Sequence, residues 1–326
     1  MLLFFQLALV SSQNNEKPLP TREIHTMMDE AISYANLPPE MTEKILENVD
    51  ACDLRTAQQV CVQWRDIINR RRHAMKRQRV KEIYISDFQD AVIATITHLS
   101  TMTSWESVST LKIADYESLF DCIWIYSPKK LNINATRNDL RKALEGIPDW
   151  WFQGIQMLGI YESACDIDAL ALVSRAPQCA SLRIDPCFTI DNVTSLLDCM
   201  KQIHELKYIR SLHKESIRSA SKTIVADDST LDALIPLSIA CPEGLQSFWV
   251  DSISTDFSLP KMFELFEKGH FSPRCSLLFE KVHGTDLALR NWINSHAQQV
   301  LYISEQTYNF SYRDVEIGVS VEQFVP

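Results

Sequence analysis

The sequence predicts an α+β protein in which a small three-helix domain is followed by an irregular α/β solenoid. Three observations lead to this fold class. Residues 21–70 contain three short amphipathic stretches with helical spacing. From Val80 onward, strand-like apolar patterns alternate with helix-like runs. The chain is 46% hydrophobic and 23% charged with only 7 glycines, which is the composition of an ordinary globular protein.

Composition also excludes several classes of protein. The 326 residues include 32 Lys and Arg against 42 Asp and Glu, and this net charge of −10 argues against a general nucleic-acid binder. No apolar run approaches the roughly 20 residues of a membrane-spanning helix. The nine cysteines are scattered without a CxxC pair, which favours buried free thiols in a reducing compartment over a disulfide framework.

Residues 1–20 are expected to be disordered or signal-like. The first ten residues (MLLFFQLALV) and the two serines after them are similar to a short secretory segment, although no Lys or Arg precedes them. Sequons for N-glycosylation begin at Asn134, Asn192 and Asn309, a number close to that expected by chance. Two interpretations stay open: a secretory signal, or an irregular start on a cytosolic protein.

The helical domain is expected over residues 21–75. Thr21 is a suitable N-cap for a first helix, which the Pro38-Pro39 pair separates from a second. Asp53 is the expected N-cap of a third helix that runs to about residue 70 in one piece. The apolar stripe of this third helix comprises Leu54, Ala57, Val60, Cys61, Trp64, Ile67 and Ile68. About 50 residues with this much apolar surface are marginal alone and predict a partner surface.

Two segments of this domain resemble the F-box family. They are Leu37–Leu54 (LPPEMTEKILENVDACDL) and Val60–Ile68 (VCVQWRDII). The family pattern is Leu-Pro-x-Glu, an Ile/Leu pair, a later aliphatic residue, Asp-Leu and then Val-Cys-x-x-Trp, and each anchor is present in order. Arg55 and Ala57 stand where the family often has leucine, which weakens the expected internal packing.

The resemblance implies a non-catalytic subunit of an SCF-type ubiquitin ligase, located in the cytoplasm or nucleus. Its F-box would dock onto a Skp-type adaptor and through it a cullin, and the C-terminal region would hold an unknown protein substrate. No cofactor is implied. The sequence does not divide the apolar F-box residues between internal core and adaptor contact. The residues expected to serve adaptor binding are Leu37, Pro38, Ile45, Leu46, Val49, Leu54, Val60, Cys61 and Trp64.

Residues 80–326 repeat a unit in which an apolar residue is followed three and five positions later by two more. The central residues 83, 111, 131, 155, 182 and 206 are spaced by 20 to 28 residues, with helix-like runs between them. A strand and a helix at this spacing resemble leucine-rich repeats. The Asn or Cys expected after the strand occurs once, as Cys187, so the repeats should be irregular. The alternative is a generic α/β domain with evenly spaced strands.

Two further patches have more than one interpretation each. Arg65–Lys81 holds eight basic residues and one acid, which indicates a nuclear import signal, a contact for an acidic partner or simply a solvated helix end. Trp150-Trp151-Phe152 is the densest aromatic cluster and belongs either to the core or to a binding surface.

No motif for catalysis is present: HExxH, GxSxG, the P-loop and GxGxxG are all absent. The carboxylate pairs Asp166/Asp168 and Asp227/Asp228 stand at predicted helix starts and are interpreted as caps. Two alternatives to a ligase subunit remain. One is a secreted or lumenal repeat protein with a coincidental F-box-like segment, and the other is an F-box protein that acts through the adaptor without a cullin.

Overall fold

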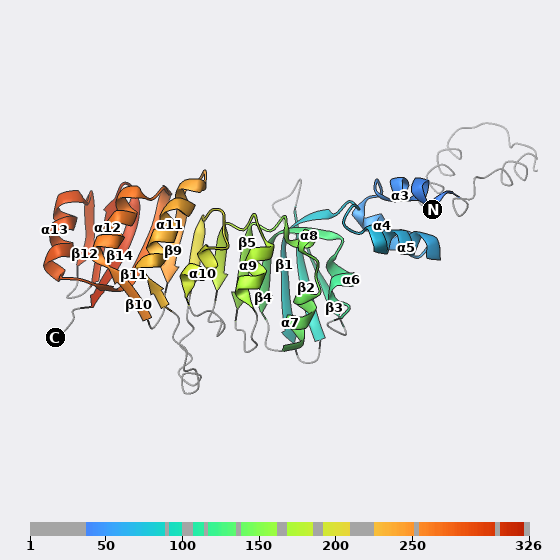
Figure 1. Cartoon of the computed structure of the whole chain (residues 1–326), viewed down its shortest axis with the longest axis horizontal. Helices are drawn as coiled ribbons and strands as arrows, with labels where there is room; N and C mark the ends of the chain where they lie inside the picture. Colours follow the sequence, from blue (N-terminus) through green and yellow to red (C-terminus); the bar gives the residue numbers. More distant parts are fainter. Residues whose placement is uncertain are drawn as a thin grey trace, which may run out of the picture. The chain divides into compact units, whose positions relative to one another are not determined.

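The structure is a computed structural model that describes residues 37–88, 91–99, 107–113, 117–134, 138–161, 168–184, 192–208, 225–250, 254–303 and 307–322. The described chain divides into two compact units (Figure 1). The first contains residues up to Arg71 except 50–52, and the second contains the rest. The signal-like residues 1–20 and the first predicted helix, over 21–35, lie outside the described residues.

The helical unit contains α3 (Pro39–Leu46), α4 (Ala51–Ala57) and α5 (Val62–Arg71). The prediction of one helix from Asp53 to about residue 70 is wrong, because the chain turns between α4 and α5. The amides of Gln59 and Val60 each bond a carbonyl only three residues back, which tightens and ends α4. Asp53 lies in the first turn of α4 and does not cap it, since that helix already begins at Ala51.

The larger unit is built on one 14-stranded sheet, whose main path runs β12-β13-β14-β11-β9-β7-β6-β5-β4-β1-β2-β3. Neighbours from β1 through β4, β5, β6, β7, β9 and β11 to β14 are parallel, and antiparallel strands adjoin this array on both sides. The strands are β1 (Gln78–Phe88), β2 (Ala91–His98), β3 (Val108–Ile113), β4 (Tyr126–Asn134), β5 (Met157–Tyr161), β6 (Ser181–Ile184), β7 (Glu205–Tyr208), β8 (Val225–Asp227), β9 (Leu245–Val250), β10 (Ser254–Ser258), β11 (Phe271–His283), β12 (Gln299–Ile303), β13 (Thr307–Tyr312) and β14 (Val315–Glu322).

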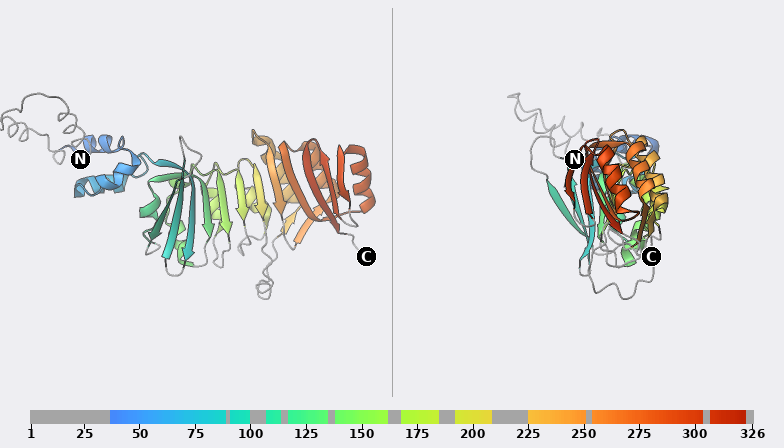
Figure 2. Two further views of the ribbon diagram at one scale, coloured as in Figure 1. Left: turned by 180° about the vertical axis from the view of Figure 1, so that it is seen from behind. Right: turned by 90° about the vertical axis from the view of Figure 1, so that its left-hand side faces the viewer.

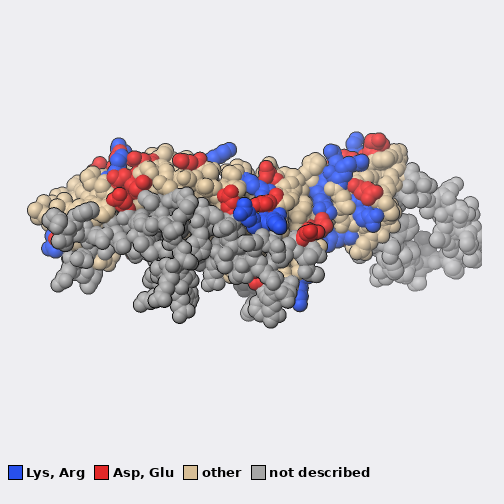
Figure 3. All heavy atoms as spheres, turned by 60° about the horizontal axis from the view of Figure 1, so that its bottom comes forward, with Lys and Arg blue, Asp and Glu red and all other residues tan. Residues whose placement is uncertain are grey.

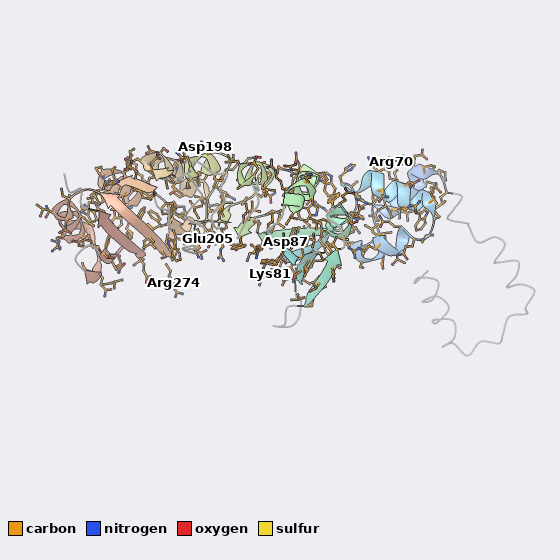
Figure 4. The ribbon with its side chains drawn as sticks, turned by 90° about the horizontal axis from the view of Figure 1, so that it is seen from below. Arg70, Lys81, Asp87, Asp198, Glu205 and Arg274 are labelled. Atoms are coloured by element: carbon orange, nitrogen blue, oxygen red, sulfur yellow. The ribbon has the colours of Figure 1, made fainter. Side chains whose placement is uncertain are left out.

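Helices connect the parallel strands and lie on one face of the sheet. The view from behind shows strands without helices over them, and the view from below shows the helices along one side (Figures 2 and 4). Asp198, just after a helix, and Glu205, on β7, are labelled on these two sides in Figure 4. The helices are α6 (Leu119–Ile123), α7 (Asn138–Glu145), α8 (Asp149–Phe152), α9 (Ala169–Arg175), α10 (Val193–Leu197), α11 (Asp228–Ala240), α12 (Leu259–Lys268) and α13 (Asp286–His296).

The core of this unit is a ladder of apolar residues at one register level across the parallel strands. Each member is at most 2% exposed, and each is paired with the next in the backbone register. The ladder consists of Ile83, Leu131, Leu158, Leu182, Leu206, Phe248, Leu277 and Ile317. Four of the predicted central residues (83, 131, 182 and 206) belong to it, so the predicted strand period reflects stacking of successive strands in the sheet.

Two predicted units do not join the ladder as expected. The unit at Phe152–Met157 is displaced, because Pro148 starts the short helix α8 and the core-facing residues of β5 are Leu158 and Ile160. The unit around Leu111 forms β3, which is antiparallel to β2 and stands outside the parallel array.

Side-chain caps start several of the helices. Asp168 accepts a bond from the Ala171 amide at the start of α9, and Asp227 forms a capping box with Thr230 at the start of α11. Asp228 instead accepts bonds from the amide and hydroxyl of Ser258, each at 2.7 Å. The interpretation of these carboxylates as structural is confirmed for Asp168 and Asp227, whereas Asp166 lies outside the described residues.

Candidate functional site

The helical unit begins with an exposed apolar corner. Pro38 is the N-cap of α3, with φ −52° and ψ 142°, and Pro39 occupies the first turn, where a missing N–H costs nothing. The Pro38 carbonyl accepts bonds from the amides of Met41 and Thr42, both at 3.0 Å. Both prolines are exposed and Leu37 is half-buried. The sequence therefore fixes a stiff turn that presents apolar surface to solvent.

The interior of the unit holds the three helices together. Leu46, Leu54 and Ile68 are fully buried, and Ile67 is nearly so. An ion-pair cluster joins α5 to α3, since Arg71 Nε lies 2.5 Å from Glu43 Oε1 and an Arg71 terminal nitrogen lies 3.6 Å from Glu47 Oε1. These contacts fix α3 against α5 and set which side of each helix is left outside.

Four large apolar side chains of this unit remain exposed. Met41 is 53% exposed, Ile45 37%, Val60 61% and Val62 61%. Met41 and Ile45 are four residues apart on α3 and therefore share a face. Val60 and Val62 flank the turn between α4 and α5. Four solvent-exposed large apolar side chains are many for a unit of about 35 described residues.

The structure separates the nine predicted adaptor-binding residues by exposure. Pro38, Ile45 and Val60 are exposed, and Leu46 and Leu54 are fully buried, so the latter two belong to the interior. The four half-buried residues are Leu37, Val49, Cys61 and Trp64. Sequence reasoning left out Met41 and Val62, which the structure exposes. The i, i+4 spacing of Met41 and Ile45 was the available signal for Met41.

Trp64 on α5 lies partly in the interior of the helical unit and partly at its surface. It is half-buried, and its indole nitrogen is buried without a hydrogen-bond partner among the described residues. A buried indole N–H without an acceptor is unfavourable by about 1–3 kcal/mol.

Three of the eight basic residues of the run 65–81 make structural contacts. Arg71 pairs with α3 as described, and Arg72 bonds Asp121 at 2.6 Å and lies over the rings of Phe120 and Trp124. Arg77 lies 5.0 Å from the centre of the Trp150 ring, and its burial lowers the pKa of the guanidinium from its ordinary value. On the described part of the face drawn in Figure 3, Lys and Arg lie among Asp and Glu.

The aromatic cluster at residues 150–152 is mainly core. Trp151 and Phe152 are fully buried, with their rings 5.3 Å apart, and the Trp151 nitrogen donates to the Ile123 carbonyl. Trp150 is half-buried between Arg77 and Phe120. The core interpretation is therefore confirmed for two of the three rings.

The described residues contain no metal-binding cluster, and two of their thiols are buried and unreactive. No group of three or more metal-ligating side chains occurs among them. Burial raises the pKa of the Cys179 and Cys275 thiols to about 12, so both are protonated at neutral pH and are poor nucleophiles. None of the described helices is both long and apolar enough to cross a membrane.

Comparison with known families decides what the helical unit is. Residues 35–74 match the F-box domain family. The chain carries an F-box domain. A comparison with curated proteins found no relative. The match covers both quoted motifs and all three described helices α3, α4 and α5, and it does not extend into the strand-rich sheet. The presence of an F-box indicates an adaptor-binding role in SCF-type ligases, and the leucine-rich-repeat resemblance of the second unit stays a prediction.

Proposed function

We propose that this F-box protein is a substrate receptor of an SCF-type ubiquitin ligase. Its F-box docks onto a Skp-type adaptor, the adaptor connects it to a cullin, and the strand-rich unit recruits a target protein. The observation that carries the proposal is the set of exposed apolar side chains on the F-box, namely Pro38, Met41, Ile45, Val60 and Val62.

Physical chemistry supports a partner for this surface. Burial of apolar surface is favourable by about 25 cal/mol per Å². Soluble monomers rarely expose several large apolar side chains on a small unit. The stiff corner at Pro38 and Pro39 loses little conformational entropy on binding because the φ angles of both residues are already fixed. Leu46 and Leu54 act indirectly in this proposal, since they support the surface from inside.

The half-buried Trp64 is assigned a shared role. Its ring packs within the unit, and its edge together with Cys61 and Leu37 contributes to the adaptor contact. Tryptophan is among the residues most enriched in binding hot spots. Substitution of Trp64 by Ala is therefore expected to lower both the stability of the F-box and its affinity for the adaptor.

Binding of the full chain to a purified Skp-type adaptor tests the docking. The double change Leu37→Ala and Pro38→Ala is expected to raise the Kd by about tenfold or more, as is Val60→Asp alone. Leu287→Asp is the matched control, because Leu287 is 67% exposed on α13, outside the F-box. Unchanged adaptor affinity in both F-box variants would overturn the docking proposal.

Co-precipitation of a cullin with the full chain tests the ligase assignment separately. Recovery of adaptor and cullin together supports a ligase subunit. Recovery of the adaptor without a cullin, under conditions in which a known F-box protein recovers both, would instead establish action through the adaptor alone.

A further inference from the structure

The helix-free face of the sheet changes character along the parallel array. At one register level its outward positions run from Asn132 on β4 and Gly159 on β5, through Arg183 on β6 and Lys207 on β7, to Trp249 on β9. The same level continues through Leu278 on β11 and Gly318 on β14 to Asn309 on β13. The charged positions are therefore followed directly by apolar ones.

The apolar part of this level borders a hollow of about 440 Å³. Strands β7, β9, β11, β12, β13 and β14 line it, and its outward side chains include Lys207, Trp249, Leu278, Leu301, Asn309 and Glu316. Trp249 is 36% exposed and Leu301 52%, although both lie on strands of a folded sheet. None of the helices that the structure describes covers this face (Figure 2).

Gly318 forms part of the floor of the hollow. A Cβ atom at this position would come within 3.0 Å of both Asn309 Oδ1 and Leu278 Cδ1, which is tighter than ordinary contact. The side chains of Asn309 and Leu278 therefore cover Gly318 and line the hollow at this point. A hollow of about 440 Å³ beside an exposed tryptophan suits one apolar side chain from a partner.

The charges next to the hollow are unbalanced. Glu205 Oε1 lies 2.9 Å from a terminal nitrogen of Arg183 and 2.9 Å from Lys207 Nζ, so two cations share one buried carboxylate and the trio carries a net charge of +1. By contrast, Glu82 and Lys130 on β1 and β4 form a balanced pair at 3.3 Å. Glu316, at the opposite side of the hollow, is exposed and acidic.

We propose that this face, from β6 through β7, β9, β11, β14 and β13 to β12, binds an extended peptide segment with an apolar anchor and an acidic residue on one side of it. The apolar side chain enters the hollow between Trp249, Leu278 and Leu301. The acidic residue bonds Arg183 and Lys207, and Glu316 repels it from the other end, which fixes the direction of the peptide. The proposal rests on the proposed function, because it names the chemistry of the segment that the ligase subunit would recruit.

The spacing of the sheet gives the spacing of the peptide. Adjacent strands lie about 4.8 Å apart, so Lys207 and Leu278, two strands apart, are separated by about 10 Å across the sheet. An extended chain rises about 3.3 Å per residue. The acidic residue and the apolar anchor should therefore be about three positions apart in a peptide that crosses the strands.

Selection of displayed random dodecapeptides on the immobilised full chain tests this. Enriched peptides should carry an aromatic or long aliphatic residue with Asp or Glu about three positions to one side. For a synthetic peptide of that sequence, Trp249→Glu and Leu301→Glu should each raise the Kd about tenfold or more. Leu287→Glu on α13 is the matched control and should leave the Kd unchanged, since Leu287 is equally apolar and 67% exposed.

A separate variant tests the role of the two cations. In Arg183→Gln with Lys207→Gln, the acidic requirement should disappear from the selected peptides while the apolar anchor stays. A circular dichroism melt identifies any variant that fails to fold. Leu301 lies on the edge strand β12, so Leu301→Glu should disturb folding less than Trp249→Glu.

Several results would overturn the peptide site. They are the absence of enrichment, a preference for basic flanking residues, and Kd values that are the same in Trp249→Glu and Leu301→Glu as in the wild-type chain. Adaptor affinity is measured on the same variants. Lost peptide binding with intact adaptor binding supports the site, whereas a wild-type chain that binds peptide but no adaptor would refute the proposed function and leave the site standing.

Discussion

Ile45 and Leu46 are neighbours on α3 with opposite environments, and the pair allows a sharp test of how the F-box is built. Leu46 is fully buried, whereas Ile45 is 37% exposed. Leu46→Ala should cost the F-box about 2–5 kcal/mol, the usual range for a buried leucine. A unit of this size has little stability to spare, so this loss should unfold α3 locally.

Ile45→Ala should act mainly on binding. Full burial of an isoleucine side chain is worth about 1.5–3 kcal/mol, and the 37% that remains exposed would contribute about 0.6–1.1 kcal/mol when an adaptor covers it. The expected rise in Kd is therefore about three- to sixfold. Leu46→Ala should weaken binding only as far as it unfolds the surface.

Hydrogen exchange of the α3 amides in the full chain, together with calorimetric titration of the adaptor, separates the two effects. Leu46→Ala should remove protection from residues 42–46, and Ile45→Ala should keep most of it. Equal protection in the two variants, or normal affinity in both, would refute the division of α3 into an inner and an outer side.

Three further predictions follow from other parts of the chain. Asp227→Ala should lower the stability of the strand-rich unit by about 1 kcal/mol through loss of the α11 cap, and Asp227→Asn should restore most of it in thermal melts; equal melting temperatures for the two variants would contradict the cap. Iodoacetamide at pH 8 should modify the exposed Cys52 and spare Cys179 and Cys275, as read by peptide mass spectrometry. Burial raises the pKa of the Cys275 thiol to about 12, against about 9 in the unfolded chain. The contribution of this thiol to stability is therefore complete below pH 9 and is lost as the pH rises through 12. Cys275→Ala should make the free energy of unfolding depend less on pH in the alkaline range.

The strand ladder is the part of the fold that the sequence predicts best. Residues such as Leu182 and Leu206 repeat at the period of one strand plus one helix, and this spacing survives because each strand must bury the same face. The pattern misses β11, where Pro273 and Arg274 interrupt the strand. Arg274 has φ 67°, and the register with β9 shifts between Phe271 and Ser276. A local irregularity of this kind leaves no apolar periodicity to read.

In the F-box, the sequence identifies the domain but does not show which of its apolar side chains are buried. Its motif is clear in the sequence, but Ile45 and Leu46 are both apolar, and only the packing of α3 against α5 decides which of them is outside. Val60 has the spacing of a helix stripe, yet it lies in the turn after α4 and is exposed. Pattern reasoning treats the segment as one long helix, and it therefore assigns the exposed and buried sides incorrectly at this point.

The alternation along the parallel strands has a consequence for recognition. In β9 the side chain of Phe248 is buried beneath the helices and that of the next residue, Trp249, faces outward; β11 repeats this with Leu277 and Leu278. Under the proposed peptide site, the residues that fold the sheet and the residues that would contact a partner alternate along the same strands. Substitution of an outward residue could then change which partner is bound while the buried residues keep the scaffold intact.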